Sequence, residues 1–212
     1  MEGLFALKHA ANHKDRRRCE STTQRDGFVL IGRVIFCARW LDGRQHDVTL
    51  WKSFGASVRG PAHIATGTPN QDAWASFHHA WVDGIVVSDG VGSKPFSNFG
   101  SDAACLAVDC AALACRIKAD ISHAEINRDF LFERIKNNWL SIISALEPRD
   151  CSATCLFAFR IGDGLIHLGM LGDGLAAALR SDGSVVSLSE DKAHGFSNIT
   201  AALSPNVLPK EW

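Results

Sequence analysis

Three aspartates stand where their carboxylates could hold a divalent metal ion. Asp89 ends the apolar stretch GIVVS, Asp173 follows LIHLGML after one glycine, and Asp72 precedes AWASFHHAW. A carboxylate at the end of a buried strand lies at a sheet edge, and Gly90 beside Asp89 leaves room for a ligand and an open carbonyl oxygen. Mg²⁺ and Mn²⁺ take carboxylates, carbonyl oxygens and water as ligands. The spacing is therefore compatible with convergence of these aspartates on one cleft.

Five Asp-Gly pairs lie between residues 83 and 183, and most of them are predicted to be turns. Asp-Gly suits tight β-hairpins because both residues tolerate positive φ. Asp83-Gly84, Asp163-Gly164 and Asp182-Gly183 are each flanked by strand-like stretches, so we predict hairpin turns there. Asp89-Gly90 leads instead into a Gly/Ser loop and a helix. Asp173-Gly174 does have a strand after it, so a turn and a site remain two alternatives for this pair.

The elements that must position the aspartates are predicted in the order β-β-β-α-α-β-β-β-β. The strands are predicted at residues 49–60, 73–81, 84–88, 152–161, 165–171, 175–181 and 184–189. An Ala- and Cys-rich helix is predicted over residues 96–118. A second helix is predicted from Ser122 to Leu146, with a capping box of Ser122 and Glu125 and an apolar stripe at helical spacing. Helices inserted between groups of strands indicate antiparallel sheets with helices packed outside them.

One domain of ordinary size is expected from 212 residues. Residues 1–47 show neither a helical period nor strand alternation, so we predict an N-terminal extension of unknown role, with disorder as one interpretation. Within it, residues 28–40 could add one strand. The folded domain is predicted over residues 48–212. The net charge of −1 does not favour nucleic acid or an anionic membrane as a partner, and the apolar segment 28–40 is too short to span a bilayer.

The seven cysteines indicate reduced thiols and a cytoplasmic location. Their number is odd, no CxxC pair occurs, and most of them lie within apolar stretches. A zinc site needs tighter ligand spacing than this, and a disulfide framework is expected in small secreted chains.

Five motifs occur in order within residues 53–203: HIATGTPNQDA, IVVSDGVGSKPFSNFGSDAA, CSATCLFAF, LGMLGDG and FSNITAAL. Together they resemble the metal-dependent serine/threonine phosphatases of the PP2C (PPM) type, and most closely a bacterial subgroup. The resemblance implies an α+β fold, a four-layer α-β-β-α sandwich of two antiparallel sheets flanked by helices. It also implies a centre of two Mn²⁺ or Mg²⁺ ions at one end of the sandwich.

The resemblance implies specific roles for individual residues of this sequence. Asp72 and Asp89 are the expected catalytic metal ligands, and Gly90 is expected to ligate through its carbonyl oxygen. Asp173 is expected near the metals, where some members of the family hold a third ion. A hydroxide that bridges two divalent ions would attack phosphorus in line. The cysteines are then not needed as nucleophiles.

The sequence also departs from the family pattern. It stops at Trp212, before a further Asp-Gly segment and a final aspartate that hold the metals in the family, so we expect a domain that lacks its C-terminal part. Many members place an arginine shortly before the first acidic motif; here Arg59 lies further away, and His63 could take its place. His63 is thus a catalytic candidate and proton donor, with a capping role in its loop as the alternative. The histidine that often follows the Asp-Gly pair is Val91 here.

The leading hypothesis is a bacterial, cytoplasmic protein phosphatase acting on phosphoserine and phosphothreonine. Its expected partners are a phosphoprotein substrate and a cognate kinase, with no nucleic acid or membrane. The alternative is a catalytically impaired phosphatase-like module that binds a phosphoprotein or a regulatory partner through the same cleft. The missing carboxylates favour the module, whereas the intact Asn-Gln-Asp and Ser-Asp-Gly motifs favour the enzyme.

Overall fold

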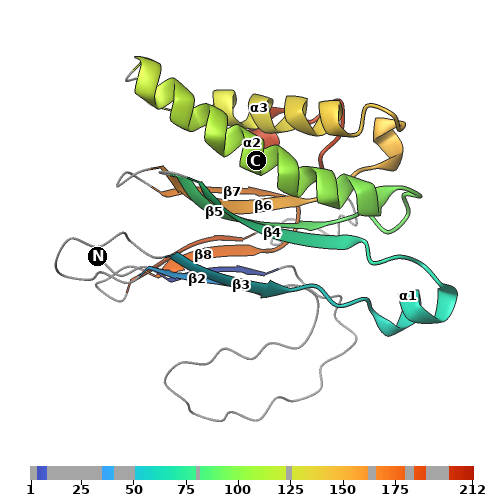
Figure 1. Cartoon of the computed structure of the whole chain (residues 1–212). Helices are drawn as coiled ribbons and strands as arrows, with labels where there is room; N and C mark the ends of the chain where they lie inside the picture. The colour runs from blue at the N-terminus through green and yellow to red at the C-terminus, as the bar shows by residue number, and fades with distance from the viewer. Residues whose placement is uncertain are drawn as a thin grey trace, which may run out of the picture.

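The computed structural model of the chain contains two antiparallel sheets stacked face to face (Figure 1). It describes residues 4–8, 35–40, 51–79, 82–122, 126–161, 166–179, 184–189 and 201–212. The four-stranded sheet has the order β4 (Asp72–His79), β5 (Val82–Asp89), β6 (Cys155–Ile161) and β7 (Ile166–Leu171). The five-stranded sheet has the order β3 (Trp51–Ala56), β2 (Ile35–Trp40), β1 (Leu4–Lys8), β8 (Leu175–Leu179) and β9 (Val185–Ser189).

Two long helices cover the outer face of the four-stranded sheet. They are α2 (Ser97–Ser122) and α3 (Arg128–Ile142), and both lie above that sheet in Figure 1. The described residues therefore show a helix layer on two sheet layers, which confirms the prediction of two antiparallel sheets flanked by helices. The short elements are α1 (Pro61–Thr66), η1 (Pro148–Asp150) and η3 (Pro209–Glu211). Among the described helices, none is both long and apolar enough to cross a membrane.

Strand alternation divides the core into two apolar layers. On the helix side of the four-stranded sheet, Phe77, Val86 and Phe157 pack among the buried residues of α2 and α3. On the other side, Ile85 and Leu156 belong to a smaller cluster between the sheets. Successive side chains of a strand point to opposite faces, so each of the central strands supplies both layers.

The small residues of α2 allow the helix to lie close to the sheet. Ala104, Ala107 and Ala111 are fully buried on its inner face, and the helix packs against β4, β5 and β6. Near its start, Gly100 lies against the main chain of Cys151, where an added Cβ would come 1.6 Å from the carbonyl oxygen. The Trp139 Nε1–H of α3 donates to the Gly100 carbonyl at 3.0 Å and ties the two helices together.

The second helix begins later than predicted. The structure continues α2 to Ser122 and starts α3 at Arg128, with Asn127 as its N-cap. The Asn127 side chain accepts a hydrogen bond from the Phe130 N–H at 2.7 Å. The predicted start at Ser122 is therefore wrong, because an asparagine five residues later satisfies the free N–H groups of the first turn. Glu125 of the predicted capping box lies outside the described residues.

The predicted hairpin turn at Asp83-Gly84 is also wrong, although the hairpin itself exists. Both residues lie inside β5, opposite His78 and Phe77 of β4. The chain needs a glycine there for packing, because a Cβ on Gly84 would lie 2.2 Å from the Phe77 ring. Asp83 forms an ion pair with His78 at 2.9 Å. The connection between the strands falls at residues 80–81, outside the described residues.

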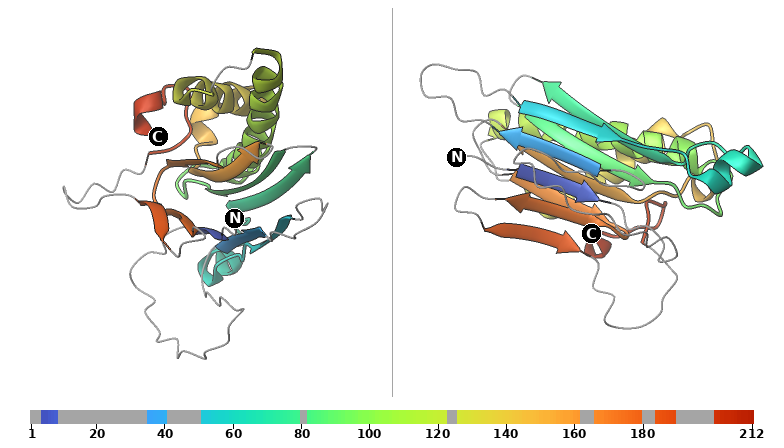
Figure 2. Two further views of the ribbon diagram at one scale, coloured as in Figure 1. Left: turned by 90° about the vertical axis from the view of Figure 1, so that its left-hand side faces the viewer. Right: turned by 90° about the horizontal axis from the view of Figure 1, so that it is seen from below.

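The other two predicted turns, Asp163-Gly164 and Asp182-Gly183, lie outside the described residues. The strands on either side of each do pair antiparallel, β6 with β7 and β8 with β9. The predicted strand within residues 28–40 is confirmed by β2. Figure 2 shows β1 between β2 and β8, so the described parts of residues 1–47 are strands of the five-stranded sheet.

Replacing Gly100 with alanine should destabilise the fold, because a methyl group would collide with the Cys151 carbonyl. We expect Gly100→Ala to lower the free energy of unfolding by about 3 kcal/mol, the upper part of the range for overpacked sites. Gly60→Ala is the matched control, since an added Cβ meets nothing within 4 Å there, and should cost no more than about 1 kcal/mol. Urea unfolding measures both. Equal stability of the two variants would contradict the close helix approach.

Candidate metal centre

Asp72 and Asp89 lie directly opposite each other at one end of the four-stranded sheet. Asp72 opens β4, Asp89 closes β5, and the antiparallel register pairs the two residues. Cβ atoms of directly opposite residues lie about 4.5–5.5 Å apart on the same face of a sheet. That face is the one between the sheets, because Asp89 follows Ile85 and Val87 of the inter-sheet cluster at alternate positions. Both aspartates are half-buried, so their carboxylates share one edge of the inter-sheet space.

The segment after Asp89 is held by main-chain hydrogen bonds to the segments on both sides of it. The Gly90 N–H donates to the Gln71 carbonyl at 2.9 Å, and the Val91 N–H donates to the Ser152 carbonyl at 2.9 Å. The buried Gln71 side chain donates to the Ser97 hydroxyl at 2.8 Å. These bonds connect the starts of β4 and α2 to the end of β5, and they fix the main chain that carries Asp89.

Gly90 needs to be a glycine because the first turn of α2 approaches it closely. An added Cβ would lie 2.6 Å from the Ser97 carbonyl oxygen and 2.7 Å from the Ser97 Cβ. The residue also forms an isolated antiparallel bridge with Ala153. Gly90 therefore lies beside the aspartate pair, and ligation through its carbonyl stays a prediction.

The structure decides against a hairpin turn at Asp173-Gly174. β7 before it belongs to the four-stranded sheet and β8 after it to the five-stranded sheet, so the Gly172–Gly174 segment crosses between the sheets. Gly172 adopts a positive φ of 101° there. An added Cβ on Gly172 would lie 2.6 Å from Thr154 Cγ2, and the Thr154 N–H donates to the Asp89 carbonyl. The crossing thus lies at the same end of the sandwich as Asp89.

His63 lies in α1, a six-residue helix between Gly60 and Gly67. This helix connects β3 to β4 at the end of the sandwich where β4 begins (Figure 1). The sheet register that pairs the two aspartates does not extend to His63. Its catalytic role, and the alternative of a loop-capping role, therefore both stay predictions.

The aspartate pair suits a hard divalent cation in the type of its donors. Mg²⁺ is usually held by one or two carboxylates and keeps several water molecules, and Mn²⁺ accepts the same oxygen ligands. Within the described residues, no group of three or more His, Cys, Asp or Glu side chains is arranged to hold a metal ion. Asp72 and Asp89 are thus the residues that the structure brings together, and metal ligation by Asp173 stays a prediction.

Two residues that the sequence analysis gave no role, Gln71 and Thr154, support the aspartate pair. Both lie within motifs of the family resemblance, next to an acidic residue or at the start of a strand. Local sequence alone gives no signal for their contacts, because these depend on which residues of β4, β5 and β6 lie opposite one another.

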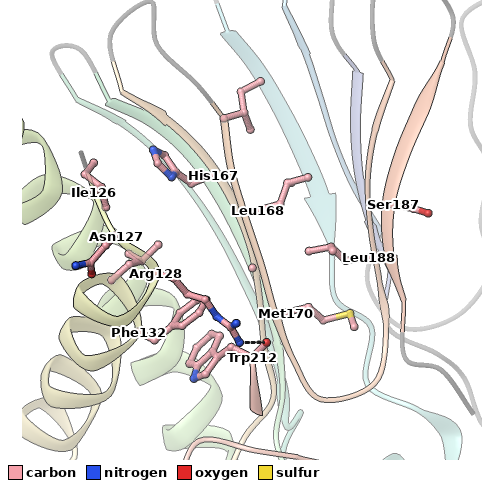
Figure 3. Close-up of a pocket in the computed structure, with 13 residues that line it drawn as sticks. Ile126, Asn127, Arg128, Phe132, His167, Leu168, Met170, Ser187, Leu188 and Trp212 are labelled. Atoms are coloured by element: carbon pink, nitrogen blue, oxygen red, sulfur yellow. Dashed lines mark hydrogen bonds between the residues drawn. The ribbon is translucent and has the colours of Figure 1, made fainter. Parts of the chain in front are cut away.

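A separate pocket of about 670 Å³ lies between α3, β7, β9 and the end of the chain (Figure 3). Trp212 stacks on Phe132 in it with ring centroids 4.6 Å apart, and Arg128 donates to the Trp212 carbonyl at 2.6 Å. His167 lines the pocket from β7, and burial lowers its pKa. Neither aspartate of the pair lines this pocket, so its chemistry is separate from theirs.

A comparison with family models supports the same interpretation. The model of the family described as Protein phosphatase 2C matches residues 59–212, which include the aspartate pair, both long helices and the crossing between the sheets. The chain belongs to the protein phosphatase 2C family. Membership supports a phosphatase-type function. A search of curated proteins found no match to this sequence.

The buried thiols in the described part of the chain are poorly suited to nucleophilic catalysis. Cys105, Cys115, Cys151 and Cys155 are buried, whereas Cys110 is exposed. Burial raises the pKa of Cys115 to about 11 and raises the pKa of Cys155 well above its ordinary value. These thiols are protonated at neutral pH, and only a thiolate attacks efficiently.

Brief treatment of the native protein with N-ethylmaleimide at pH 8 should therefore modify Cys110 and leave the four buried thiols unmodified. Peptide mapping by mass spectrometry reads each position separately. After denaturation all five should react, because burial no longer raises the pKa values or blocks access. Modification of Cys155 in the native protein would contradict this assignment.

Proposed function

We propose that this chain is a metal-dependent protein phosphatase that hydrolyses phosphoserine and phosphothreonine, with Mn²⁺ or Mg²⁺ held by Asp72 and Asp89. The observation that carries the proposal is the register that sets these two carboxylates opposite each other within a protein phosphatase 2C domain. Phosphoprotein substrates and a cognate kinase are the proposed partners, in a bacterial cytoplasm.

The chain's own groups have distinct roles in this proposal. Asp72 and Asp89 hold the cation, and the bonds from Gln71 and Thr154 keep their main chain in place. When bound, two divalent ions would supply a hydroxide nucleophile at neutral pH and neutralise charge on the phosphoryl oxygens. His63 is the candidate proton donor to the leaving hydroxyl group.

The activity of this chain should depend on a divalent metal ion. The purified chain should hydrolyse p-nitrophenyl phosphate and a phosphothreonine peptide with Mn²⁺ or Mg²⁺, but not with EDTA. Asp72→Asn and Asp89→Asn should each lower kcat/KM by at least about 100-fold, because a weakened metal site loses several kcal/mol of transition-state charge stabilisation. A phosphotyrosine peptide should be a poor substrate.

Asp120→Asn is the matched control for these variants. Asp120 is an exposed residue of α2 whose carboxylate pairs with Arg116 at 2.7 Å, so its loss should leave kcat/KM near the wild-type value. Activity that persists in EDTA, or that Asp89→Asn leaves unchanged, would overturn the proposal. Preference for the phosphotyrosine peptide would overturn the serine/threonine assignment alone.

A second candidate function is a phosphatase-like module that binds a phosphoprotein without hydrolysing it. It is favoured by the pairing of only two carboxylates in the described part of the chain. The module predicts that the folded chain binds the phosphothreonine peptide and releases no phosphate at any Mn²⁺ concentration. Fluorescence anisotropy of a labelled peptide, run beside phosphate release, separates the two functions.

A further inference from the structure

The ladder between β5 and β6 changes its bonding where it reaches Asp89. The register runs from Val82 opposite Ile161 to Val87 opposite Leu156. The bridge between Gly90 and Ala153 continues the same register, so Asp89 lies opposite Thr154. In a hydrogen-bonded antiparallel pair the two residues exchange both of their N–H···O bonds.

Asp89 and Thr154 make only one of these two main-chain bonds. The Thr154 N–H donates to the Asp89 carbonyl at 2.8 Å. The Asp89 N–H donates instead to the Thr154 hydroxyl oxygen at 2.8 Å. The Thr154 carbonyl accepts from the Ser88 hydroxyl at 2.6 Å. Two side-chain bonds thus replace one main-chain bond, a form of competition that serine and threonine hydroxyls offer to secondary structure.

This exchange gives each main-chain N–H and carbonyl of the pair a hydrogen-bond partner while it fixes the position of Asp89. Thr154 and Ser88 are 3% and 0% exposed, so an unpaired N–H or carbonyl at this point would be costly. Thr154 binds both main-chain groups of Asp89, and the orientation of the Asp89 side chain follows from its main chain. The Thr154 hydroxyl therefore helps to determine where the Asp89 carboxylate lies relative to Asp72.

The other branch of the Thr154 side chain contacts the crossing that carries Asp173. An added Cβ on Gly172 would lie 2.6 Å from Thr154 Cγ2 and 2.8 Å from the Ala201 carbonyl oxygen. The methyl group thus packs against the main chain just before Asp173. A single buried side chain contacts both segments at this end of the sandwich.

We infer that Thr154 is a positioning residue for the metal centre. Its hydroxyl holds Asp89 in place by accepting the Asp89 N–H, and its methyl group supports the Gly172–Gly174 crossing. This inference rests on the proposed function, because it assumes that Asp89 holds a metal ion. The hydrogen bonds from which it is drawn do not depend on a metal ion. The hydroxyl is assigned the larger effect on metal affinity, since it contacts the residue that bears a ligand.

Two substitutions separate the hydroxyl from the methyl group. Thr154→Val keeps the methyl and removes the acceptor, whereas Thr154→Ser keeps the hydroxyl and removes the methyl. Isothermal titration of the metal-free protein with Mn²⁺ should give about 10–100-fold weaker binding for Thr154→Val, as for other residues that orient metal ligands. Thr154→Ser should remain near the wild-type affinity.

Ser152→Ala is the matched control, because Ser152 is a nearby buried residue whose hydroxyl contacts the Arg149 carbonyl at 3.5 Å rather than Asp89. Its Mn²⁺ affinity should equal that of the wild type. Thermal unfolding without metal shows whether each variant is folded. Wild-type affinity in folded Thr154→Val, or equal losses in Thr154→Val and Thr154→Ser, would overturn the role of the hydroxyl.

If Thr154→Val does not fold, Ser88→Ala decides the question. Without the Ser88 hydroxyl, the Thr154 carbonyl is able to accept the Asp89 N–H, the main-chain bond re-forms and Asp89 shifts. Mn²⁺ binding should then weaken, and an unchanged affinity would overturn the inference.

The Asp89→Asn variant distinguishes failure of this inference from failure of the proposed function. If Asp89→Asn binds Mn²⁺ as tightly as the wild type does, the proposed metal centre itself is wrong. If Asp89→Asn binds Mn²⁺ weakly while Thr154→Val binds it with wild-type affinity, only the positioning role of Thr154 is refuted.

Discussion

The antiparallel register at one end of the four-stranded sheet is the constraint on which the candidate site depends. Because β4, β5 and β6 lie side by side, residues far apart in the sequence become direct neighbours there: Asp72 lies opposite Asp89, and Asp89 lies opposite Thr154. A slip of β5 by one residue would turn its side chains to the other face of the sheet. The metal centre that we propose would then lose the Asp89 carboxylate from the inter-sheet space.

The helix layer supports this register through close main-chain contacts. Gly90 lies against Ser97 at the start of α2, and Gly100 one turn later lies against Cys151, shortly before β6. Trp139 of α3 binds the Gly100 carbonyl. The packing of the two helices is thus coupled to the end of the sheet at which the aspartates lie, and substitutions in the helix layer are expected to affect the site.

The sequence predicted the strand ends that carry Asp72 and Asp89 because motifs and alternation are local signals. The prediction failed where a contact between residues far apart in the sequence determines the local structure. Gly84 suits a turn by its type, yet it lies within a strand because the Phe77 ring occupies the space beside it. The second helix begins after the N-cap Asn127 rather than at the predicted capping box of Ser122 and Glu125. The role of Thr154 could not be predicted, since it depends on the pairing of Thr154 with Asp89, which lies 65 positions away in the sequence.

The central claim is that one divalent cation contacts both Asp72 and Asp89. Anomalous diffraction from crystals of the chain soaked in MnCl₂ tests this claim most directly. The account predicts an anomalous peak within metal–oxygen bonding distance of both carboxylates, at the end of the four-stranded sheet where β4 begins and β5 ends. A peak that contacts neither aspartate, or no peak in crystals where both side chains are ordered, would contradict it.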